Sequence, residues 1–317
     1  MVRMDHHGDN VWALAFSPDE VLVATGGAPG WARVFDSTSG RELASLNHDR
    51  SVWAVGFSPD GARLATGSDD GKARVFDAKT WQEQARLGSR VGQVSAVAFG
   101  ADGSRLAFGT RLGPAWVFDL DSGLELAFLD NEEWVRSVAF SPDGSWLVTG
   151  GDDGRARVFD AKTWRRSVDL DHNGHPVWAV GFSPEGTWLV TGTLQGLVTV
   201  FDVDTWQEIT RIDHDEPVNA VRFSSDGTRL ATGTGRLARV FDVGTWQEIA
   251  HIDHTDEVLE VRFTSDGTRL AVGGRDGAIR MSAVTPQLLL QQAYRAMSRP
   301  LNEAELSRYL VPFASTS

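Results

Sequence analysis

The sequence predicts an all-β fold: a seven-bladed β-propeller of four-stranded antiparallel blades, with a short helical C-terminal tail. The main observation is a repeated phrase, in which a valine is followed by a phenylalanine and then by Ser-Pro-Asp-Gly or a variant of it. Its phenylalanines are spaced 41, 42, 41, 42, 41 and 40 residues apart, at Phe16, Phe57, Phe99, Phe140, Phe182, Phe223 and Phe263. The 33 glycines of the chain also indicate many tight turns between short strands. Units of about 40–45 residues with four strands cannot bury their own faces, so they stack side by side and close into a ring.

The second unit shows how each predicted element follows from its residues. Its first strand alternates in period two and is rich in strand-forming residues, as in Val-Trp-Ala-Val-Gly-Phe. The segment Pro59-Asp60-Gly61 predicts a turn, and Asp70-Gly71 supplies the positive φ that a tight hairpin turn requires. The four predicted strands are residues 52–57, 63–67, 73–77 and 83–87.

The two ends of the repeat region predict how the ring closes. Residues 2–6 match the ends of predicted fourth strands at 211–214 and 251–254, whereas the seventh unit shows only three strands and ends near Ala283. We therefore expect residues 1–6 to supply the missing outer strand of the seventh blade. The predicted propeller domain spans residues 1–284.

The last residues, 285–317, are predicted to form a helical C-terminal extension. Residues 287–297 have the apolar spacing of an amphipathic helix, and Pro300 ends it. Asn302 and Glu305 then predict the start of a second helix.

Composition narrows the function classes. The 43 acidic residues outnumber the 30 basic ones, and a net charge of −13 disfavours nucleic-acid binding. The absence of cysteine excludes disulfides, thiolate metal sites and a cysteine nucleophile. The N-terminus lacks an apolar signal segment, and no stretch approaches the roughly 20 apolar residues of a membrane span. We therefore expect a cytoplasmic protein without membrane association, and we predict no cofactor.

The units resemble WD repeats over residues 2–284. The resemblance rests on the His before the first strand, Phe-Ser-Pro-Asp-Gly, Leu-Ala-Thr-Gly-Ser, Asp-Gly in the second turn and an aromatic-Asp pair that ends the third strand. It implies the seven-bladed propeller of the WD-repeat (WD40) family, here of bacterial type, with the function of a non-catalytic protein-interaction or sensor platform. The implied partner is a protein or peptide, and the propeller is expected to be monomeric.

The tail carries a second resemblance. Its apolar helix, followed by Arg-x-Leu-x-x-x-Glu and Tyr309-Leu310, is similar to the segment after WD repeats in large bacterial multidomain proteins. The resemblance implies that this chain is the partner-recognition part of a multidomain signalling or defence protein, or a stand-alone derivative of one.

The third strand departs from the family pattern. It ends in Phe-Asp instead of Trp-Asp in six units, so the indole N–H of the family's His–Ser/Thr–Asp–Trp hydrogen-bond chain is missing. A His–Thr–Asp remnant is complete only in the second unit, with His48, Thr66 and Asp70. Because a catalytic site is not repeated in every blade, we interpret these residues as a structural network and predict no catalytic residues.

The resemblance also implies where a partner binds. The usual surface is the narrow face, which is built by the loops that lead into the first strands and by the turns between second and third strands. Tryptophan and arginine are enriched there, as at binding hot spots. The alternative is that Val-Trp-Ala is a strand consensus whose indole packs over the channel. The predicted partner-binding residues of this narrow-face rim are Trp12, Trp53, Trp134, Arg136, Trp178, Asn219, Leu259, Asp69, Asp152, Arg111 and Arg275, beside Ser95, Leu194 and Glu257.

Three other recurring sets are predicted to be structural. Tryptophans at the turn before the outer strand, where two units have Gly40 and Gly123, are expected to cap a blade against its neighbour: Trp81, Trp164, Trp206 and Trp246. Arginines at one third-strand position are expected to pair between blades and not to form an anion-binding ring: Arg33, Arg74, Arg157 and Arg239. The Asp-His and Asn-His pairs lie in different blades, so no metal site is predicted.

Two further functions remain open. A propeller enzyme, such as a hydrolase or lyase with its site at the channel mouth, requires a cluster of titratable groups that is not repeated in the other units. We identify only repeat-equivalent groups in the sequence, which argues against an enzyme. The other alternative is a structural scaffold that only holds two domains of a parent protein together.

Overall fold

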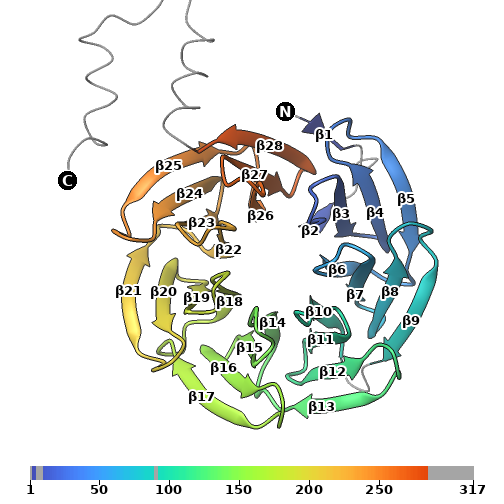
Figure 1. Ribbon diagram of the computed structural model, residues 1–317. Helices are drawn as coiled ribbons and strands as arrows, with labels where there is room; N and C mark the ends of the chain where they lie inside the picture. Colours follow the sequence, from blue (N-terminus) through green and yellow to red (C-terminus); the bar gives the residue numbers. More distant parts are fainter. Residues whose placement is uncertain (1, 5–9, 89–91, 285–317) are drawn as a thin grey trace, which may run out of the picture.

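The computed structural model describes residues 2–4, 10–88 and 92–284, which form a ring of seven four-stranded antiparallel sheets around a central channel (Figure 1). The predicted fold class is therefore confirmed. Blades 1 to 6 each consist of four consecutive strands, from β2–β5 to β22–β25. Blade 7 has the order β1-β28-β27-β26, so its outer strand comes from the opposite end of the chain.

The strands have nearly uniform lengths in all blades. The inner strands are β2 (Val11–Phe16), β6 (Val52–Phe57), β10 (Val94–Phe99), β14 (Val135–Phe140), β18 (Val177–Phe182), β22 (Val218–Phe223) and β26 (Val258–Phe263). The second strands are β3 (Leu22–Gly27), β7 (Arg63–Ser68), β11 (Arg105–Thr110), β15 (Trp146–Gly151), β19 (Trp188–Thr193), β23 (Arg229–Thr234) and β27 (Arg269–Gly274). The third strands are β4 (Trp31–Asp36), β8 (Lys72–Asp77), β12 (Ala115–Asp119), β16 (Arg155–Asp160), β20 (Leu197–Asp202), β24 (Leu237–Asp242) and β28 (Ala278–Ala283). The outer strands are β5 (Glu42–Asn47), β9 (Glu83–Gly88), β13 (Glu125–Leu129), β17 (Arg166–Asp171), β21 (Glu208–Asp213), β25 (Glu248–Asp253) and β1 (Val2–Arg3).

The N-terminal segment closes the ring through main-chain pairing. Val2 pairs with Ile279 and Arg3 with Ala278, so β1 completes the sheet of blade 7. Met4 is buried, and it packs in a cluster with Leu14 of blade 1 and with Ile279. The first and last blades are thereby joined. The other residues of the predicted closing segment and the predicted helical extension at 285–317 lie outside the described residues.

Adjacent blades pack on each other where the second strand carries its glycine. In blade 2, a Cβ atom on Gly67 would lie 2.6 Å from Cγ1 of Val94, the first residue of the next inner strand. In blade 1, a Cβ on Gly26 would lie 2.7 Å from Cγ1 of Val52. No side chain fits such a gap, so the repeated Thr-Gly and the repeated valine fit each other in neighbouring blades.

The Phe-Asp pair at the end of the third strand serves both the core and a turn. In blade 2, the phenyl ring of Phe76 is buried, whereas Asp77 is at the surface. Oδ1 of Asp77 accepts hydrogen bonds from the backbone N–H of Thr80 at 2.8 Å and from its hydroxyl at 2.9 Å. Aspartate therefore stabilises the turn to the outer strand, a role that does not need the missing indole.

The tryptophans before the outer strands cap one blade against the next, as predicted. Trp206 of blade 5 meets Trp146 of blade 4 edge to face, with ring centroids 5.4 Å apart. Trp246 of blade 6 meets Trp188 of blade 5 in the same way, at 6.5 Å. All four residues of this set have a φ of 57–59°, which glycine adopts more easily. Packing between blades therefore holds these residues in a strained conformation.

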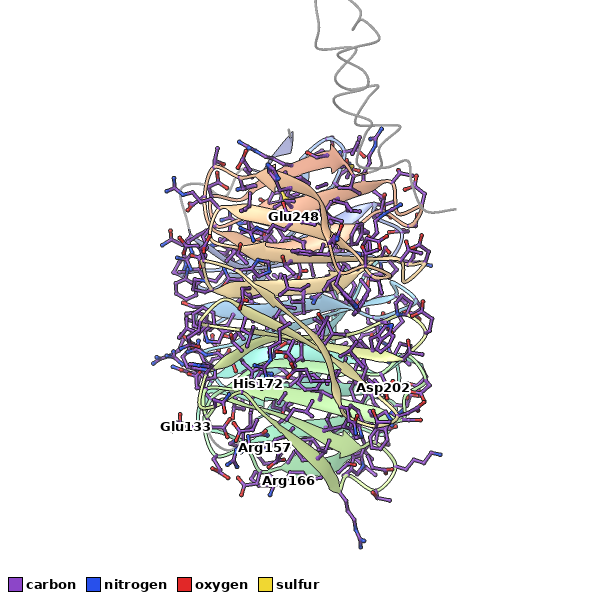
Figure 2. The ribbon with its side chains drawn as sticks, turned by 90° about the vertical axis from the view of Figure 1, so that its left-hand side faces the viewer. Glu133, Arg157, Arg166, His172, Asp202 and Glu248 are labelled. Atoms are coloured by element: carbon purple, nitrogen blue, oxygen red, sulfur yellow. The ribbon has the colours of Figure 1, made fainter. Side chains whose placement is uncertain are left out.

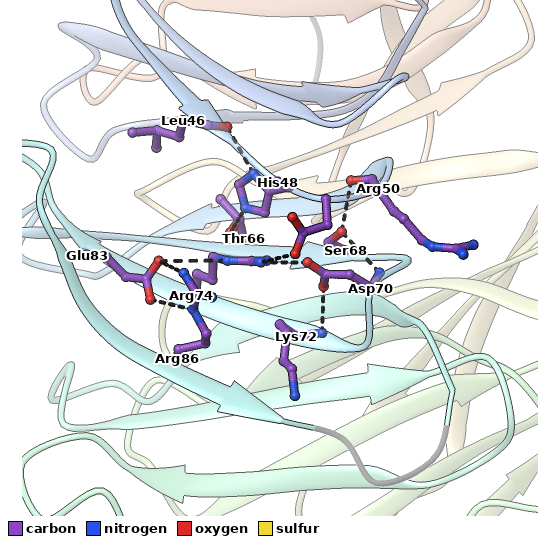
Figure 3. Close-up of polar contacts among 11 residues, drawn as sticks. Leu46, His48, Arg50, Thr66, Ser68, Asp70, Lys72, Arg74, Glu83 and Arg86 are labelled. Carbon is purple, nitrogen blue, oxygen red and sulfur yellow. Dashed lines mark hydrogen bonds and ion pairs between the residues drawn. The ribbon is translucent and has the colours of Figure 1, made fainter.

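The predicted His–Thr–Asp network forms only in part (Figure 3). His48 Nε2 lies 2.8 Å from the Thr66 hydroxyl, and its Nδ1 lies 2.9 Å from the carbonyl oxygen of Leu46. The prediction that Asp70 joins them is wrong, because Asp70 accepts a hydrogen bond of 2.6 Å from Arg74. A charge-assisted pair with a guanidinium is stronger than a neutral hydrogen bond.

The same histidine–threonine link occurs outside blade 2. His172 Nε2 and the Thr191 hydroxyl are 2.8 Å apart in blade 5, although no aspartate stands at the matching turn position. In blade 4, Asn131 takes the place of histidine and accepts a hydrogen bond of 2.7 Å from Thr149. The two-residue link is therefore the repeated unit, and it does not depend on the aspartate.

The third-strand arginines pair with carboxylates mainly within their own blade, and the predicted pairing between blades is limited to acids on the connecting loops. Arg74 contacts Asp70 on the preceding turn and, at 3.7 Å, Glu83 on the outer strand (Figure 3). Arg157 is fully buried and pairs with Asp153 in the same way. Arg74 also lies 3.7 Å from Asp49, and Arg157 lies 3.5 Å from Glu132, each on the loop that arrives from the preceding blade. The buried charge of each arginine is therefore balanced by its own blade together with the incoming loop.

Candidate partner-binding face and channel

The predicted rim residues lie at the ends of the inner strands where the connecting loops arrive. Figure 2 shows the ring from its edge, with Glu133 and His172 of two such loops toward one face and Asp202, at the end of a third strand, toward the other. The face that carries Glu133 and His172 is the one on which the sequence predicts that a partner binds. Each rim position is the second residue of an inner strand or a residue of the adjacent loops and turns.

On blades 1 and 2, two indoles of the rim pack together. The ring centroids of Trp12 and Trp53 are 3.9 Å apart, with an interplanar angle of 36°. Trp53 also lies beside Asp69 on the turn of its own blade. Burial raises the pKa of the Asp69 carboxyl, and the indole N–H of Trp53 opposes this shift. The aspartate thus lies in a partly desolvated place next to an aromatic ring.

Arginine side chains continue this packing across blades 3 to 5. The guanidinium carbon of Arg111 lies 5.6 Å from the ring centroid of Trp53 and 3.9 Å from that of Trp134. Arg136 covers the same Trp134 ring at 3.3 Å and lies 5.1 Å from the ring of Trp178. We call this continuous series, which runs over five blades, the rim ladder: Trp12, Trp53, Arg111, Trp134, Arg136 and Trp178.

Three other predicted rim residues, Asn219, Glu257 and Arg275, form a separate polar group on blades 6 and 7. Asn219 donates hydrogen bonds to Glu257 at 3.1 Å and to the carbonyl oxygen of Val258 at 3.0 Å. Glu257 also forms an ion pair of 2.7 Å with Arg275. The structure therefore does not bring Asn219, Leu259 and Arg275 into the ladder, although they lie on the same face.

The rim tryptophans are half-buried and are not the fully exposed cluster that the sequence suggested. Trp12, Trp53 and Trp178 line the mouth of the central channel, as the alternative interpretation of Val-Trp-Ala expected. Within the described residues, the indole N–H groups of Trp134 and Trp178 are covered and have no hydrogen-bond partner. The surface offered to a partner therefore consists mainly of ring edges and faces and of guanidinium groups.

The central channel is a cavity of about 560 Å³ lined by the seven inner strands. Most of its lining is small or apolar, with Ala15, Gly56 and Ala98 among the residues on blades 1 to 3. On blades 6 and 7 it is charged instead, with Arg222, Glu260 and Arg262. The expectation that only repeat-equivalent titratable groups surround the axis is therefore wrong.

The charged group has a defined geometry. Arg222 donates a hydrogen bond of 2.8 Å to Glu260 and another of 2.8 Å to the carbonyl oxygen of Val221. Burial raises the pKa of Glu260. Burial, and after it the positive charge of Arg222, lowers the pKa of Arg262. We call these three residues, Arg222, Glu260 and Arg262, the channel cluster.

The channel cluster had a signal in the sequence. The residue before the repeat phenylalanine is alanine or glycine in five units and arginine in only two, Arg222 and Arg262. A comparison of the units position by position reveals this break. It does not reveal that Glu260 joins the arginines, because that contact depends on how two neighbouring blades are placed.

Two features are absent from residues 2–4, 10–88 and 92–284, the part of the chain that the structure describes. No group of three or more His, Asp or Glu side chains in this part is placed to hold a metal ion. No helix in it is long and apolar enough to cross a membrane.

A known protein family matches most of the chain. The family model for the WD domain, G-beta repeat, matches six segments of the chain: residues 2–36, 40–77, 124–160, 167–202, 206–242 and 246–281. The unmatched stretch 78–123 contains β10, β11 and β12 of blade 3, which the structure nevertheless folds as a four-stranded blade with β13. A search of curated proteins finds no match.

Proposed function

The chain belongs to the WD-repeat family, whose propellers are generally non-catalytic platforms for protein interactions, and from this premise we propose that the rim ladder binds a protein or peptide partner. The observation that carries the proposal is the continuity of the ladder. Each member contacts the next, from Trp12 on blade 1 to Trp178 on blade 5. Contiguous tryptophan and arginine side chains at a channel mouth match the composition of hot spots in interfaces.

The charges of the ladder suggest the chemistry of the partner. Arg136 is committed to Asp152, with hydrogen bonds of 2.7 and 2.8 Å. Arg111 stacks between two indoles, and its charge opposes the rise that burial causes in the pKa of the nearby Asp69, but it forms no direct ion pair with a carboxylate of the described residues. An acidic side chain of the partner supplies the missing partner for Arg111, and apolar groups beside it cover the indoles. We therefore propose an acidic, partly apolar segment as the bound element.

The experiment is capture of partners from the native host by the wild-type chain and by the double variant Trp53→Ala/Trp178→Ala. The matched control is Phe128→Ala, which removes an aromatic side chain that is 52% exposed on the outer strand of blade 3, away from the rim. We expect the double variant to weaken binding of the captured partner by about 100-fold, and the control to bind like the wild type. Capture of the same partner with unchanged affinity by a folded double variant contradicts the assignment of the ladder.

We further propose the narrower setting that the sequence resemblances imply. In it, the chain is the sensor or partner-recognition part of a bacterial multidomain signalling or defence protein, and it works in the cytoplasm as a monomeric propeller. With an antibody against the propeller, an immunoblot gives the size of the natural protein in the native host, and cell fractionation gives its location. Light scattering on the purified chain measures its oligomeric state. A natural protein no larger than this chain contradicts the multidomain setting. A dimer in solution contradicts the monomeric propeller.

A further inference from the structure

The wall of the central channel is asymmetric. The position before the repeat phenylalanine carries a small residue on the first five blades, at Ala15, Gly56, Ala98, Ala139 and Gly181. On blades 6 and 7 the same position carries Arg222 and Arg262, and both line the cavity. Strands β22 and β26 are neighbours in the ring, and β6 and β10 lie across the channel from them (Figure 1). A charged wall therefore lies across the channel from a wall of small residues.

The charges of this wall do not balance. Glu260 pairs with Arg222 at 2.8 Å, and its side chain is only 15% exposed. Arg262 is half-buried on the next strand, and it has no ion pair or hydrogen bond with any residue that the structure describes. The charges of Glu260 and Glu20 act on Arg262 without a direct ion pair, so Glu260 is the one carboxylate that pairs directly with either guanidinium in this part of the described structure. A partly desolvated cation whose nearest carboxylates form no direct ion pair with it is unfavourable, so the site favours an added anion.

We propose that the channel binds a small molecule through an oxyanion group, a carboxylate or a phosphate, which Arg262 and Arg222 hold together. The planar guanidinium presents paired N–H donors that match the oxygen atoms of both groups. The rest of the molecule lies against the small side chains of the opposite wall. The cavity of about 560 Å³ is of the size that accommodates a small ligand. Glu260 orients Arg222 and limits the negative charge that the site accepts.

The test is titration calorimetry of the purified chain with citrate and with inorganic phosphate at constant ionic strength. The variant Arg262→Ala installs the residue that blades 1, 3 and 4 have at this position, so it fits the fold. We expect it to weaken binding at least tenfold. Glu260→Gln is expected to strengthen binding several-fold, because it removes the competing negative charge. Arg166→Ala is the control, since Arg166 lies on the outer strand of blade 4 and its side chain is 48% exposed.

Saturable binding of either anion with one site per chain, weakened by Arg262→Ala and unchanged by Arg166→Ala, supports the proposal. The anion that binds more tightly identifies the headgroup as carboxylate or phosphate. The absence of saturable binding by both anions, or equal affinity in wild type and Arg262→Ala, overturns it. Unfolding midpoints of all variants establish that each is folded. Because this titration needs no protein partner, its result is independent of the proposal for the rim ladder.

Discussion

Arg136 donates two hydrogen bonds to the carboxylate of Asp152, at 2.7 and 2.8 Å, while its guanidinium lies 3.3 Å from the ring centroid of Trp134. The second residue of the inner strand is thereby tied to the second turn of the same blade. In blade 2, Trp53 and Asp69 occupy the same two positions and also lie together. On blades 2 and 4 this contact between inner strand and turn therefore holds a member of the rim ladder in place.

The first prediction concerns this pair. Arg136→Ala leaves Asp152 without its guanidinium and uncovers one face of Trp134. We expect a loss of about 1–2 kcal/mol in the free energy of unfolding, measured with urea. The control is Arg155→Ala, whose ion pairs are longer, at 3.8 and 3.9 Å, and whose side chain is 40% exposed. That variant is expected to lose less than about 0.5 kcal/mol. Equal losses in the two variants would show that the geometry of the rim pair adds nothing.

The second prediction concerns ring closure. Met4 is 2% exposed and packs between the first and last blades, whereas Met281 is 43% exposed on β28. Met4→Ala is expected to lower the free energy of unfolding by about 2–4 kcal/mol, because it leaves a cavity at the closing contact. Met281→Ala removes the same side chain from the surface and is expected to cost less than about 1 kcal/mol. Thermal unfolding of both variants measures the difference, and similar midpoints would argue against a closing role for the N-terminal segment.

The third prediction concerns the strained turns. Trp206 has a φ of 57° and packs against Trp146. Both Trp206→Ala and Trp206→Gly lose this packing, but glycine adopts the positive φ without the penalty that alanine incurs. We expect the glycine variant to be more stable than the alanine variant by about 1 kcal/mol, with both below the wild type. Urea unfolding decides the order, and an alanine variant equal to or above the glycine variant would contradict the proposed strain.

The fourth prediction concerns the fully buried Arg157. Asp153→Gln removes the nearer and more buried of its two carboxylate partners and leaves the exposed Glu132 at 3.5 Å, so it is expected to cost about 3 kcal/mol. Blade 5 has Gln195 and Thr199 at the two matching positions. The double variant Asp153→Gln/Arg157→Thr copies that arrangement and is expected to recover at least about 1 kcal/mol of the loss. Additive losses in urea unfolding would show that the two side chains do not depend on each other.

The fifth prediction concerns pH. Burial, and next the charge of Arg74, lowers the pKa of His48 to about 4, below its ordinary value of 6.5. As the pH falls, the unfolded chain therefore takes up this proton before the folded one does. The stability contributed by neutral His48 is complete above about pH 6.5 and is lost between about pH 6.5 and 4, by up to about 3 kcal/mol.

His48→Asn tests this dependence. Asn131 makes the same bond to threonine in blade 4, so asparagine keeps the link but does not titrate. Urea unfolding at pH 7 and at pH 4.5 is expected to show a smaller loss of stability in the variant than in the wild type. The same pH dependence in both proteins would mean that His48 is not the group that responds. His214, whose pKa burial also lowers to about 4, accounts for part of the dependence that remains.

The positions of the strands and turns follow from short-range signals in the sequence. The inner strand Val52–Phe57 and the turn at Gly61, with a φ of 71°, fall where alternation and Pro-Asp-Gly place them. The pairing of β1 with β28 follows from the likeness of the first residues to a strand that the seventh unit lacks. These signals are local, or they recur at a fixed period, so a single sequence is enough to read them.

The choice of polar partners follows from the tertiary structure. Asp70 has two suitable neighbours, the histidine–threonine link and Arg74, and only the side-chain geometry decides for the arginine. The bond between Arg222 and Glu260 joins residues 38 apart in the chain. Repeat comparison can mark either residue as unusual without placing them together.

The sequence by itself therefore determined the seven blades, their strand order, the closing segment and the face on which the rim residues lie. The tertiary structure decided that six of those residues form a continuous ladder, and that three charged residues meet in the channel. The physical reason is that strand formation depends on neighbouring residues and turn geometry. A hydrogen bond or ion pair instead depends on distances of a few ångströms between strands about 40 residues apart, which only the closed ring fixes.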